Sequence, residues 1–293
     1  MPPPSLGRCA CGVCGQSFYR AGRKYRRLLD RDRFSFIVHD VVHPLPDLDA
    51  DIVYNLACPA SPVHYRRNPV ETVRTNVSGT IHACELARKT GAVMIQASTS
   101  EVYGDPLVHP QPEEYRGNVN PVGPRACYDE GKRCAETILS DYVREYGMDG
   151  RIVRIFNTYG PAMAKDDGRV VSNFLVQALR GDDITIYGDG KQTRSFQYVD
   201  DLIDALFRIA ERGKSGNIFN IGNPEERTIL SIAETVVEKT GSKSKIVFRP
   251  LPQDDPARRC PDISRAKREL GWEPRVSFDR GLEKTIAYFR TIV

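Results

Sequence analysis

The chain has 293 residues, which is enough to bury a substantial core in one large or two smaller domains. Its hydrophobic content of 40% and charged content of 27% are ordinary for a soluble globular protein. The net charge of +4 is small and spread along the chain, which argues against a dedicated nucleic-acid binder and is compatible with an anionic small molecule.

The N-terminal segment is the part that fits a folded pattern least. Cys9, Cys11 and Cys14 cluster beside basic residues, but no second cysteine pair or histidine follows at zinc spacing, so we expect no metal site. A disordered tail is the plainest alternative. Met1–Ser5 contain no apolar signal region and no run in the chain is long enough to span a bilayer. We therefore expect no membrane partner and a cytoplasmic location, where cysteines stay reduced.

The next part of the chain alternates between short apolar runs and amphipathic stretches. These predict strands at 34–38, 51–57, 92–95 and 151–156, and helices at 68–90 and 127–146. Asn68 before Pro69 is a good N-cap for the first helix. Residues 105–125 form a loop of about twenty residues, which in a compact enzyme is usually functional or mobile.

Beyond residue 160 the pattern becomes mixed. We expect helices at 170–179 and 231–239, another helix that starts at Asp200, and two final helices. Short strands are predicted at 184–187 and 218–222.

The residues with the clearest chemistry follow the apolar run at 92–95. Thr99 and Glu101 come just after this buried strand, at the end where ligands of open α/β sheets bind. Tyr128 and Lys132 share one helix face through their i, i+4 spacing. Such a pair alone is weak evidence, since an exposed helical pair is the ordinary alternative. The order of strand, Thr, Glu and then this helix strengthens the case.

Proton transfer is a physical reason for this group. A hydroxyl that loses a hydride needs a base, and free tyrosine with a pKa of about 10 is a poor base at neutral pH. A nearby ammonium favours the tyrosinate, so we expect Lys132 to lower the pKa of Tyr128. Thr99, Tyr128 and Lys132 resemble the catalytic trio of the extended short-chain dehydrogenase/reductase family.

Longer motifs narrow this resemblance. The stretches Asn55–Pro62, Ala97–Pro106, Gly123–Lys132 and Pro252–Pro256 resemble those of UDP-glucuronate decarboxylases, also called UDP-xylose synthases. Arg259 and the Pro261–Asp262 pair belong to the same pattern. The resemblance covers roughly Leu28 to the C-terminus, and several long motifs in one order are a specific signal.

The resemblance implies an α/β fold with two units. Residues 28–160 would form a truncated NAD-binding domain, a Rossmann-like doubly wound parallel sheet that lacks its first strand and Gly-rich loop. Residues 161–293 would form a smaller mixed α/β domain that binds mainly the substrate and returns segments to the first unit. Residues 1–27 are an aberrant or disordered segment. The resemblance also implies a UDP-sugar substrate and a homodimer formed through the Tyr128 helix and its neighbour.

The resemblance assigns roles to residues along the chain. The catalytic group would be Thr99, Glu101, Tyr128, Lys132 and Arg259. The NAD contacts would be Asp40, Val41, Leu56, Ala57, Asn76, Tyr128 and Lys132. The substrate contacts would be Asn157, Asn173, Arg194, Gln197 and Arg259. Taken singly, Asp40 also fits a turn, Asn76 an exposed helix position, and the substrate contacts plain surface polarity. Glu101 also fits a loop carboxylate, and Arg259 a diphosphate clamp.

The implied reaction is NAD-dependent oxidation of UDP-glucuronate at C4, loss of CO₂ from the 4-keto acid, and reduction to UDP-xylose. Glu101 and Arg259 are implicated in the decarboxylation half. A sugar-nucleotide 4-epimerase or 4,6-dehydratase is the enzymatic alternative. In dehydratases of this fold, the Thr is followed by an Asp-Glu pair. Here Ser100 and Glu101 occupy those positions, and the serine disfavours a dehydratase activity. A noncatalytic sugar-nucleotide binder is a further alternative.

The family's opening segment is missing from the sequence. Members begin with a strand and a Gly-x-x-Gly-x-x-Gly loop that lets the backbone approach the cofactor pyrophosphate. Back-translation of Val13–Tyr25, read from the second base of each codon, permits a sequence that resembles the family's second strand. We therefore hypothesise that roughly Ser5–Arg27 is translated out of frame, with the glycine loop encoded upstream of Met1. On this view the chain binds NAD weakly or not at all and is an inactive truncated homologue.

Overall fold

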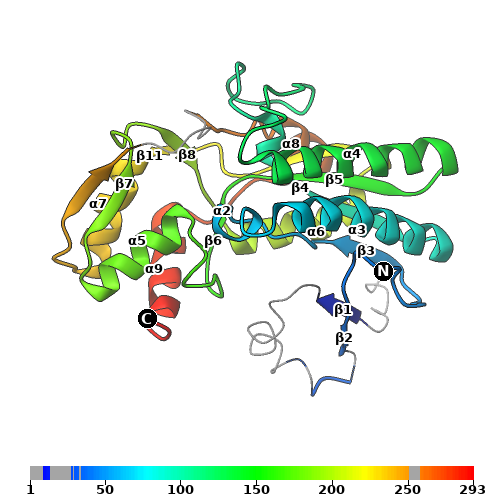
Figure 1. Cartoon of the computed structure of the whole chain (residues 1–293), viewed down its shortest axis with the longest axis horizontal. Helices are drawn as coiled ribbons and strands as arrows, with labels where there is room; N and C mark the ends of the chain where they lie inside the picture. Colours follow the sequence, from blue (N-terminus) through cyan, green and yellow to red (C-terminus); the bar gives the residue numbers. More distant parts are fainter. Residues whose placement is uncertain (1–8, 14–27, 29, 33, 251–257) are drawn as a thin grey trace.

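A four-stranded parallel sheet lies at the centre of the computed structural model, which describes residues 9–13, 28, 30–32, 34–250 and 258–293 (Figure 1). Its strand order is β10-β5-β4-β3, made of Ile218–Ile221, Gly150–Ile155, Val93–Thr99 and Ile52–Asn55. Strand β4 is paired on both sides, with β3 and with β5. Since all four strands are parallel, their carboxyl ends meet at one edge, where β4 ends at Thr99.

Helices cover both faces of this sheet. On one face lie α3 (Pro69–Thr90) and α4 (Ala126–Tyr146), which enclose a core with Met94 and Leu139. On the other face lie α6 (Val199–Arg212) and α8 (Ser264–Leu270), packed around the buried Trp272. Two helical layers around a parallel sheet confirm the predicted doubly wound α/β fold.

The start of α3 differs from its prediction. Asn68 precedes the helix as expected, but its side chain makes no capping hydrogen bond. Its carbonyl oxygen instead accepts from the backbone N–H of Thr72 at 3.0 Å and from the Thr72 hydroxyl at 3.1 Å. The helix ends at Gly91, which takes the left-handed conformation with φ 72° that favours glycine.

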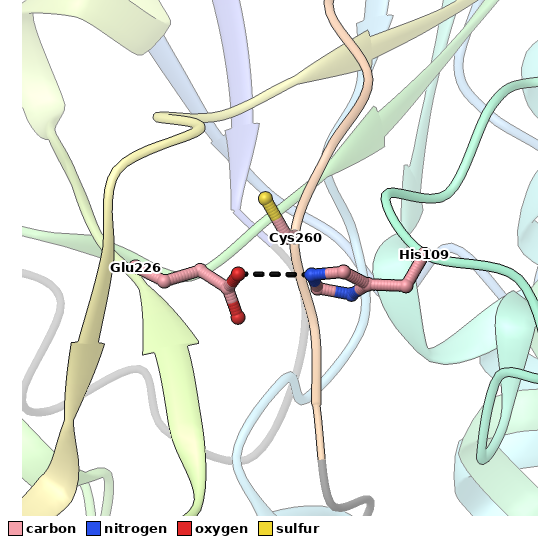
Figure 2. A group of neighbouring side chains, drawn as sticks. All are labelled: His109, Glu226 and Cys260. Carbon is pink, nitrogen blue, oxygen red and sulfur yellow. Dashed lines mark hydrogen bonds and ion pairs between the residues drawn. The ribbon is translucent and has the colours of Figure 1, made fainter.

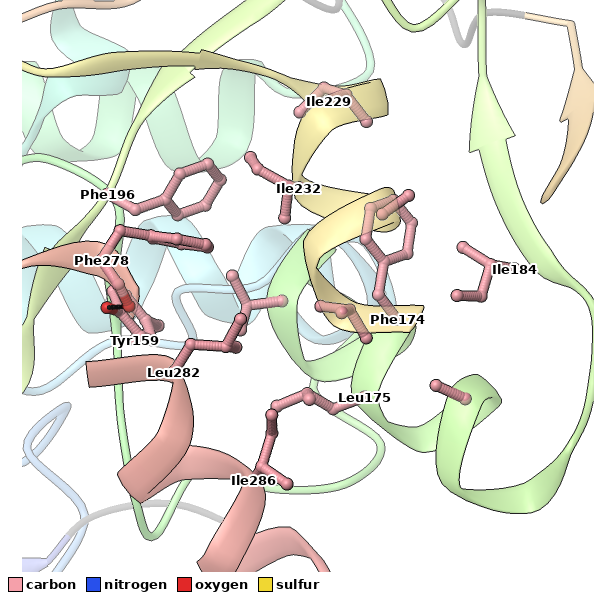
Figure 3. Close-up of a cluster of buried hydrophobic side chains, with 14 of the residues drawn as sticks. Tyr159, Phe174, Leu175, Ile184, Phe196, Ile229, Ile232, Phe278, Leu282 and Ile286 are labelled. Atoms are coloured by element: carbon pink, nitrogen blue, oxygen red, sulfur yellow. Dashed lines mark hydrogen bonds between the residues drawn. The ribbon is translucent and has the colours of Figure 1, made fainter. Parts of the chain in front are cut away.

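A smaller mixed unit packs beside the sheet. It contains α5 (Val170–Arg180), α7 (Ile229–Thr240) and α9 (Phe278–Phe289), whose apolar faces meet in one core (Figure 3). Three short strand pairs complete it: β7 (Ile184–Tyr187) with β12 (Ile246–Arg249), β8 (Thr193–Ser195) with β11 (Glu226–Thr228), and β6 (Thr158–Tyr159) with β9 (Gln197–Tyr198). Helices α6 and α8 and strand β10 come from the same half of the sequence but pack on the main sheet.

Among the described strands, the β3 edge of the sheet has no partner. Strand β1 (Cys9–Val13), where a disordered tail was the alternative, pairs in parallel with β2 (Phe34–Val38) in a separate two-stranded sheet. No described strand pairs with the outer edge of β3, and nearby Ile52 and Leu56 are 38% and 55% exposed. This edge agrees with the expected lack of a central strand. Apart from β1, the segment Ser5–Arg27 of the out-of-frame hypothesis lies outside the described residues. The motif at 252–256 also lies outside them.

In the described part of the chain, no helix combines the length and apolar character that crossing a bilayer requires.

Candidate active site

The site begins where β4 ends. Thr99 is the last residue of the strand, and its hydroxyl oxygen accepts from the backbone N–H of Glu101 at 3.2 Å. This capping contact starts the short 3-10 helix η1 (Ser100–Tyr103), which contains Glu101. Thr99 is itself 7% exposed, so the turn holds its hydroxyl at a sheltered position at the sheet edge.

Helix α4 carries the next two groups. Tyr128 and Lys132 are both buried, at 5% and 3% exposed. The Tyr128 ring stacks on Tyr65 of the short helix α2 (Pro62–Tyr65), with centroids 4.9 Å apart and planes at 5°. The Lys132 ammonium donates to the Ala97 carbonyl at 2.8 Å and lies 6.0 Å from the Tyr128 ring centroid. The structure therefore brings together Thr99, Tyr128 and Lys132, as predicted.

A glycine lets α4 approach α3 at this point. A Cβ at Gly131 would lie 2.8 Å from the side-chain nitrogen of Asn76. Asn76 is 1% exposed and donates to the Thr72 carbonyl at 3.0 Å, while its Oδ1 has no hydrogen-bond partner. Asn76 is thus a buried contact between the helices rather than an exposed helix residue.

The protonation of Tyr128 differs from the prediction. Burial is the main cause that raises its pKa well above the ordinary value, and Cys58 raises it further. A hydrogen bond with Thr99 and the charge of Arg169 lower it by less. Burial also lowers the pKa of Lys132, whose ammonium bonds to a backbone carbonyl and not to the phenol. The expectation that Lys132 alone brings Tyr128 towards neutral pH is therefore not met.

Glu101 forms a doubly bonded ion pair with Arg259. Arg259 is 4% exposed, and its guanidinium nitrogens donate to the two Glu101 oxygens at 2.6 and 3.1 Å. Arg125 also pairs with the same carboxylate. Burial would raise the pKa of Glu101, but Arg259 and Arg125 outweigh it and lower the pKa to about 2. Glu101 is therefore held as a carboxylate and is a poor proton donor.

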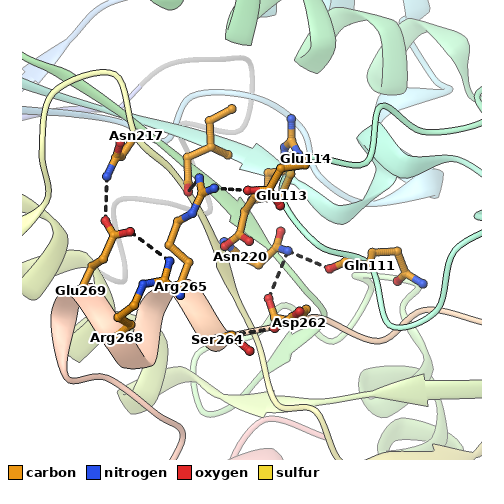
Figure 4. A network of polar contacts seen from close by, with 12 residues as sticks. Gln111, Glu113, Glu114, Asn217, Asn220, Asp262, Ser264, Arg265, Arg268 and Glu269 are labelled. Atoms are coloured by element: carbon orange, nitrogen blue, oxygen red, sulfur yellow. Dashed lines mark hydrogen bonds and ion pairs between the residues drawn. The ribbon is translucent and has the colours of Figure 1, made fainter.

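The loop at 105–125 holds the Arg259 segment in place. Gln111 exchanges backbone bonds with the segment, donating to the Cys260 carbonyl at 2.9 Å and accepting from the Asp262 N–H at 2.9 Å. The Gln111 side chain also accepts from the Cys260 N–H at 2.9 Å. Asn220 of β10 donates to the Gln111 and Asp262 carbonyls, and its N–H donates to Glu113 (Figure 4). These buried bonds fasten the middle of the loop to the Arg259 segment and to β10.

A second contact fastens the same loop from its other side. The His109 ring nitrogen lies 2.9 Å from a Glu226 oxygen, and the Cys260 sulfur lies nearby (Figure 2). Thr193 donates to the other Glu226 oxygen at 2.6 Å, and the Cys260 thiol donates to the Pro224 carbonyl at 3.4 Å. Because these groups already have partners within the protein, we assign the group a bracing role.

Sequence reasoning missed Arg125, Asp129 and Arg169. Asp129 is 7% exposed, and its Oδ1 has no hydrogen-bond partner. Arg169 pairs with Asp167 at 2.5 and 2.8 Å, and its charge acts on Tyr128. Arg125 and Asp129 both lie in the motif at 123–132, and their charges within that motif were the available signal in the sequence.

Four of the residues assigned to NAD follow the ends of β2 and β3. Asp40 is exposed and accepts from the Val42 N–H at 3.1 Å, and Val41 is buried against Gly79 of α3. Leu56 is 55% exposed, and the Ala57 N–H donates to the Asn55 side chain at 3.2 Å. The unpartnered Oδ1 of Asn76 and the exposed Leu56 fit the nicotinamide end of NAD. In the described residues no glycine-rich turn fits its pyrophosphate.

The residues assigned to the substrate divide into two groups. Asn157 and Asn173 are half-buried, and Asn173 donates to the Gly168 carbonyl at 3.0 Å. Arg194 is buried and bonds to the Thr193 carbonyl at 2.9 Å. Gln197 is 0% exposed, and its amide donates to the Thr158 hydroxyl and the Ile221 carbonyl at 3.0 Å. Its side-chain oxygen Oε1 has no hydrogen-bond partner, so the predicted contact of Gln197 with the substrate stays a prediction.

Comparisons with known proteins agree with this site. The family model described as GDP-mannose 4,6 dehydratase matches residues 33–285. UDP-glucuronic acid decarboxylase 1 of Arabidopsis thaliana is 55% identical over 92% of this chain, which spans 62% of that relative. UDP-glucuronic acid decarboxylase 3 of the same plant is 53% identical over 92% of this chain, and the matched part makes up 78% of that relative. The chain thus spans less than two thirds of the first relative and more of the second.

Solved structures give the same picture of the fold. A UDP-glucuronic acid 4-epimerase from Bacillus cereus, in complex with UDP-glucuronic acid and NAD, has a TM-score of 0.86 at 27% identity and covers 97% of this chain and 91% of its own. A dTDP-glucose 4,6-dehydratase from Streptomyces venezuelae has a TM-score of 0.84 at 26% identity over 92% and 84% of the two chains. On its sequence relatives and its fold, the chain belongs to the UDP-glucuronic acid decarboxylase family of the extended short-chain dehydrogenase/reductases.

Proposed function

We propose that the chain catalyses, or derives from an enzyme that catalyses, NAD-dependent decarboxylation of UDP-glucuronate to UDP-xylose. The observation that carries this proposal is the Glu101–Arg259 pair. Glu101 lies two residues after Thr99 and its charge acts on Tyr128, and the buried Arg259 donates to both of its oxygens. A hydride-transfer trio alone fits many sugar nucleotides. A buried arginine next to that trio favours a sugar that carries a carboxylate.

The first chemical task is to remove the proton from the sugar C4 hydroxyl. NAD, when bound, supplies the oxidation by taking a hydride from the sugar and later returning it. Tyr128 would accept the hydroxyl proton, and the Thr99 hydroxyl would hold the substrate oxygen in line. Because Tyr128 is a neutral phenol by itself, the positive charges of Lys132 and Arg169 would have to act together on it in the reacting complex.

The second task is the loss of CO₂. Oxidation at C4 gives a β-keto acid, whose carboxyl group leaves as the bonding electrons move into an enolate. Arg259 has an unpartnered Nε in addition to its bonds with Glu101, so it has one donor left for the carboxylate or the enolate. Glu101 is ionised, which supports a role in orienting Arg259 rather than in donating a proton itself.

The remaining assignments are proposals of the same kind. Asp40, Val41, Leu56, Ala57 and Asn76 would contact NAD. The substrate nucleotide would be held by Asn157, Asn173, Arg194, Gln197 and Arg259. The domain limits at 28–160 and 161–293 also remain a proposal.

We further propose a homodimer through α3 and α4. Supporting it, Val70 and Val73 of α3 are 72% and 39% exposed and line one groove with Pro121 and Ala126. A cytoplasmic location is supported by the cysteines 58, 84, 127, 134 and 260, which are unpaired. Light scattering of the purified chain, with Val70→Asp as the variant, tests the dimer.

The test of function is product analysis. The purified chain is incubated with NAD and UDP-glucuronate, and UDP-xylose and CO₂ are measured together with NAD retained by the protein. UDP-xylose formation that is lost in Tyr128→Phe supports the proposal. UDP-galacturonate as the product would identify an epimerase instead. A chain that neither binds NAD nor turns over its substrate would be the inactive homologue of the alternative hypothesis.

A further inference from the structure

Asp129 is a buried carboxyl group to which the proposed reaction gives no task. It follows Tyr128 on α4, is 7% exposed, and leaves Oδ1 without a hydrogen-bond partner. A buried carboxylate without partners is costly, whereas the protonated acid is tolerated far better. The nearby Arg259 has the complementary feature, a buried Nε without a partner. Two unsatisfied groups beside one ion pair indicate that the cluster is built for a further ligand.

The charges around Asp129 can be counted. The groups that act on it or respond to it are Glu101, Arg125, Arg259, Glu130, Tyr65 and Cys127. Burial is the largest effect and raises the pKa of Asp129, Glu101 raises it further, and the two arginines only partly offset this, so that the pKa is about 7. The dipole of α4 favours the ionised form at this position, but it acts on a side chain already removed from water.

A carboxylate bound at Arg259 would change this balance. It would place a further negative charge near Asp129, which disfavours the ionised form of the Asp129 carboxyl group. Binding of an anionic ligand would therefore be coupled to uptake of a proton by Asp129, whereas a neutral ligand would leave the balance as it is.

We propose that Asp129 is a positioning residue that selects acidic sugars: it takes up a proton when a sugar carboxylate binds at Arg259. The inference rests on the proposed function, which supplies the carboxylate. It predicts that an acidic sugar nucleotide binds with proton uptake at Asp129 and that a neutral one does not. Affinity for the acidic ligand should therefore fall as the pH rises above the range in which Asp129 keeps its proton.

The experiment is carbon NMR of the full chain with ¹³C-labelled aspartate carboxyl groups, titrated from pH 4 to 9. Asp129→Asn assigns the signal. We expect this signal to titrate near neutral pH, to move to lower pH in Glu101→Gln, and to move much less in the matched variant Glu130→Gln. At pH 8, UDP-glucuronate should return the signal to its protonated position, and UDP-xylose should not.

Each outcome decides the inference separately from the function. A signal that titrates below pH 5 in the free chain overturns it, even if UDP-xylose is formed in the activity assay. An equal response to UDP-glucuronate and UDP-xylose overturns it as well. If the free-chain titration is near neutral and depends on Glu101, but no UDP-glucuronate binds, the proton-holding role of Asp129 stands and the proposed function fails.

Discussion

The ion pair between Glu136 and Arg154 offers a direct test of what holds α4 against the sheet. Both residues are buried, at 9% and 8% exposed, and Arg154 donates to the two Glu136 oxygens at 2.9 and 2.8 Å. Ser98 of β4 donates to the same carboxylate at 2.5 Å, and Arg154 also bonds to the Tyr103 hydroxyl at 2.9 Å. This network lies one helical turn after Lys132 and joins α4 to β4, β5 and η1.

Glu136→Gln removes the negative charge and leaves the Arg154 guanidinium buried without a counter-charge. Breaking a buried pair from one side costs about 3–5 kcal/mol, and the one charge-assisted hydrogen bond that glutamine cannot replace accounts for about 1.5–3 kcal/mol of this cost. The assay is urea unfolding followed by the emission of Trp272, which is 1% exposed in the folded chain and will respond to solvent.

The matched control is Glu71→Gln on α3. Glu71 pairs with Arg74 at 3.2 Å, but the two side chains are 40% and 55% exposed. Exposed pairs of this kind contribute about 0.3–0.5 kcal/mol, so the control should unfold almost as the parent does. If Glu136→Gln costs less than about 1 kcal/mol, the buried network does not fix α4 in the way we argue.

Three further predictions concern packing, charge and pH. Gly281→Ala should cost about 1–3 kcal/mol in unfolding free energy, because the new Cβ would lie 2.3 Å from the Tyr159 hydroxyl oxygen; an unchanged melting temperature would contradict the packing. Arg259→Lys should lower kcat/KM for UDP-glucuronate by about 10-fold or more, since one charge-assisted hydrogen bond contributes about 1.5–3 kcal/mol and lysine lacks the planar fork; equal values would exclude Arg259 from the reaction. The pKa of Asp129 is raised to about 7, so its contribution to stability is present in acid and is lost as the pH rises to 7. The opposite holds for Glu101, whose pKa is lowered to about 2, so that its contribution is lost as the pH falls from 4.5. The melting temperature of Asp129→Asn relative to the parent should therefore rise from pH 4 to pH 7, and parallel curves would refute this sign.

Local features of the site were predictable because local patterns determine them. The apolar run before Thr99 indicated a buried strand, and the spacing of Tyr128 and Lys132 put both on one helix face. The meeting of Glu101 with Arg259 was different. These residues are 158 positions apart, and only the resemblance to a family linked them, because residue pattern carries no information on contacts over that distance.

Protonation states could not be predicted from residue types. The phenol of Tyr128 and the ammonium of Lys132 suggested a pair that stabilises charge, but burial opposes the charged form of both. The same property decides which carboxyl group keeps a proton. Glu101 has two arginine partners and is ionised. Asp129 forms no ion pair with any described residue, and its pKa lies nearer neutral pH.

The open edge of β3 and the active-site group are separate features of this chain. Strand β4, which ends at Thr99, has a partner on each side, and the Asn55 amide of β3 donates to the Gln96 side chain of β4 at 2.9 Å. The Glu101–Arg259 pair is held by η1 and by Gln111, which also contacts Asn220 of β10, the strand at the opposite end of the sheet from β3. A deficit at the β3 edge would therefore weaken contacts with the cofactor first. The residues that we propose to recognise the carboxylate would keep their arrangement, so binding of UDP-glucuronate and binding of NAD should be separable in this chain.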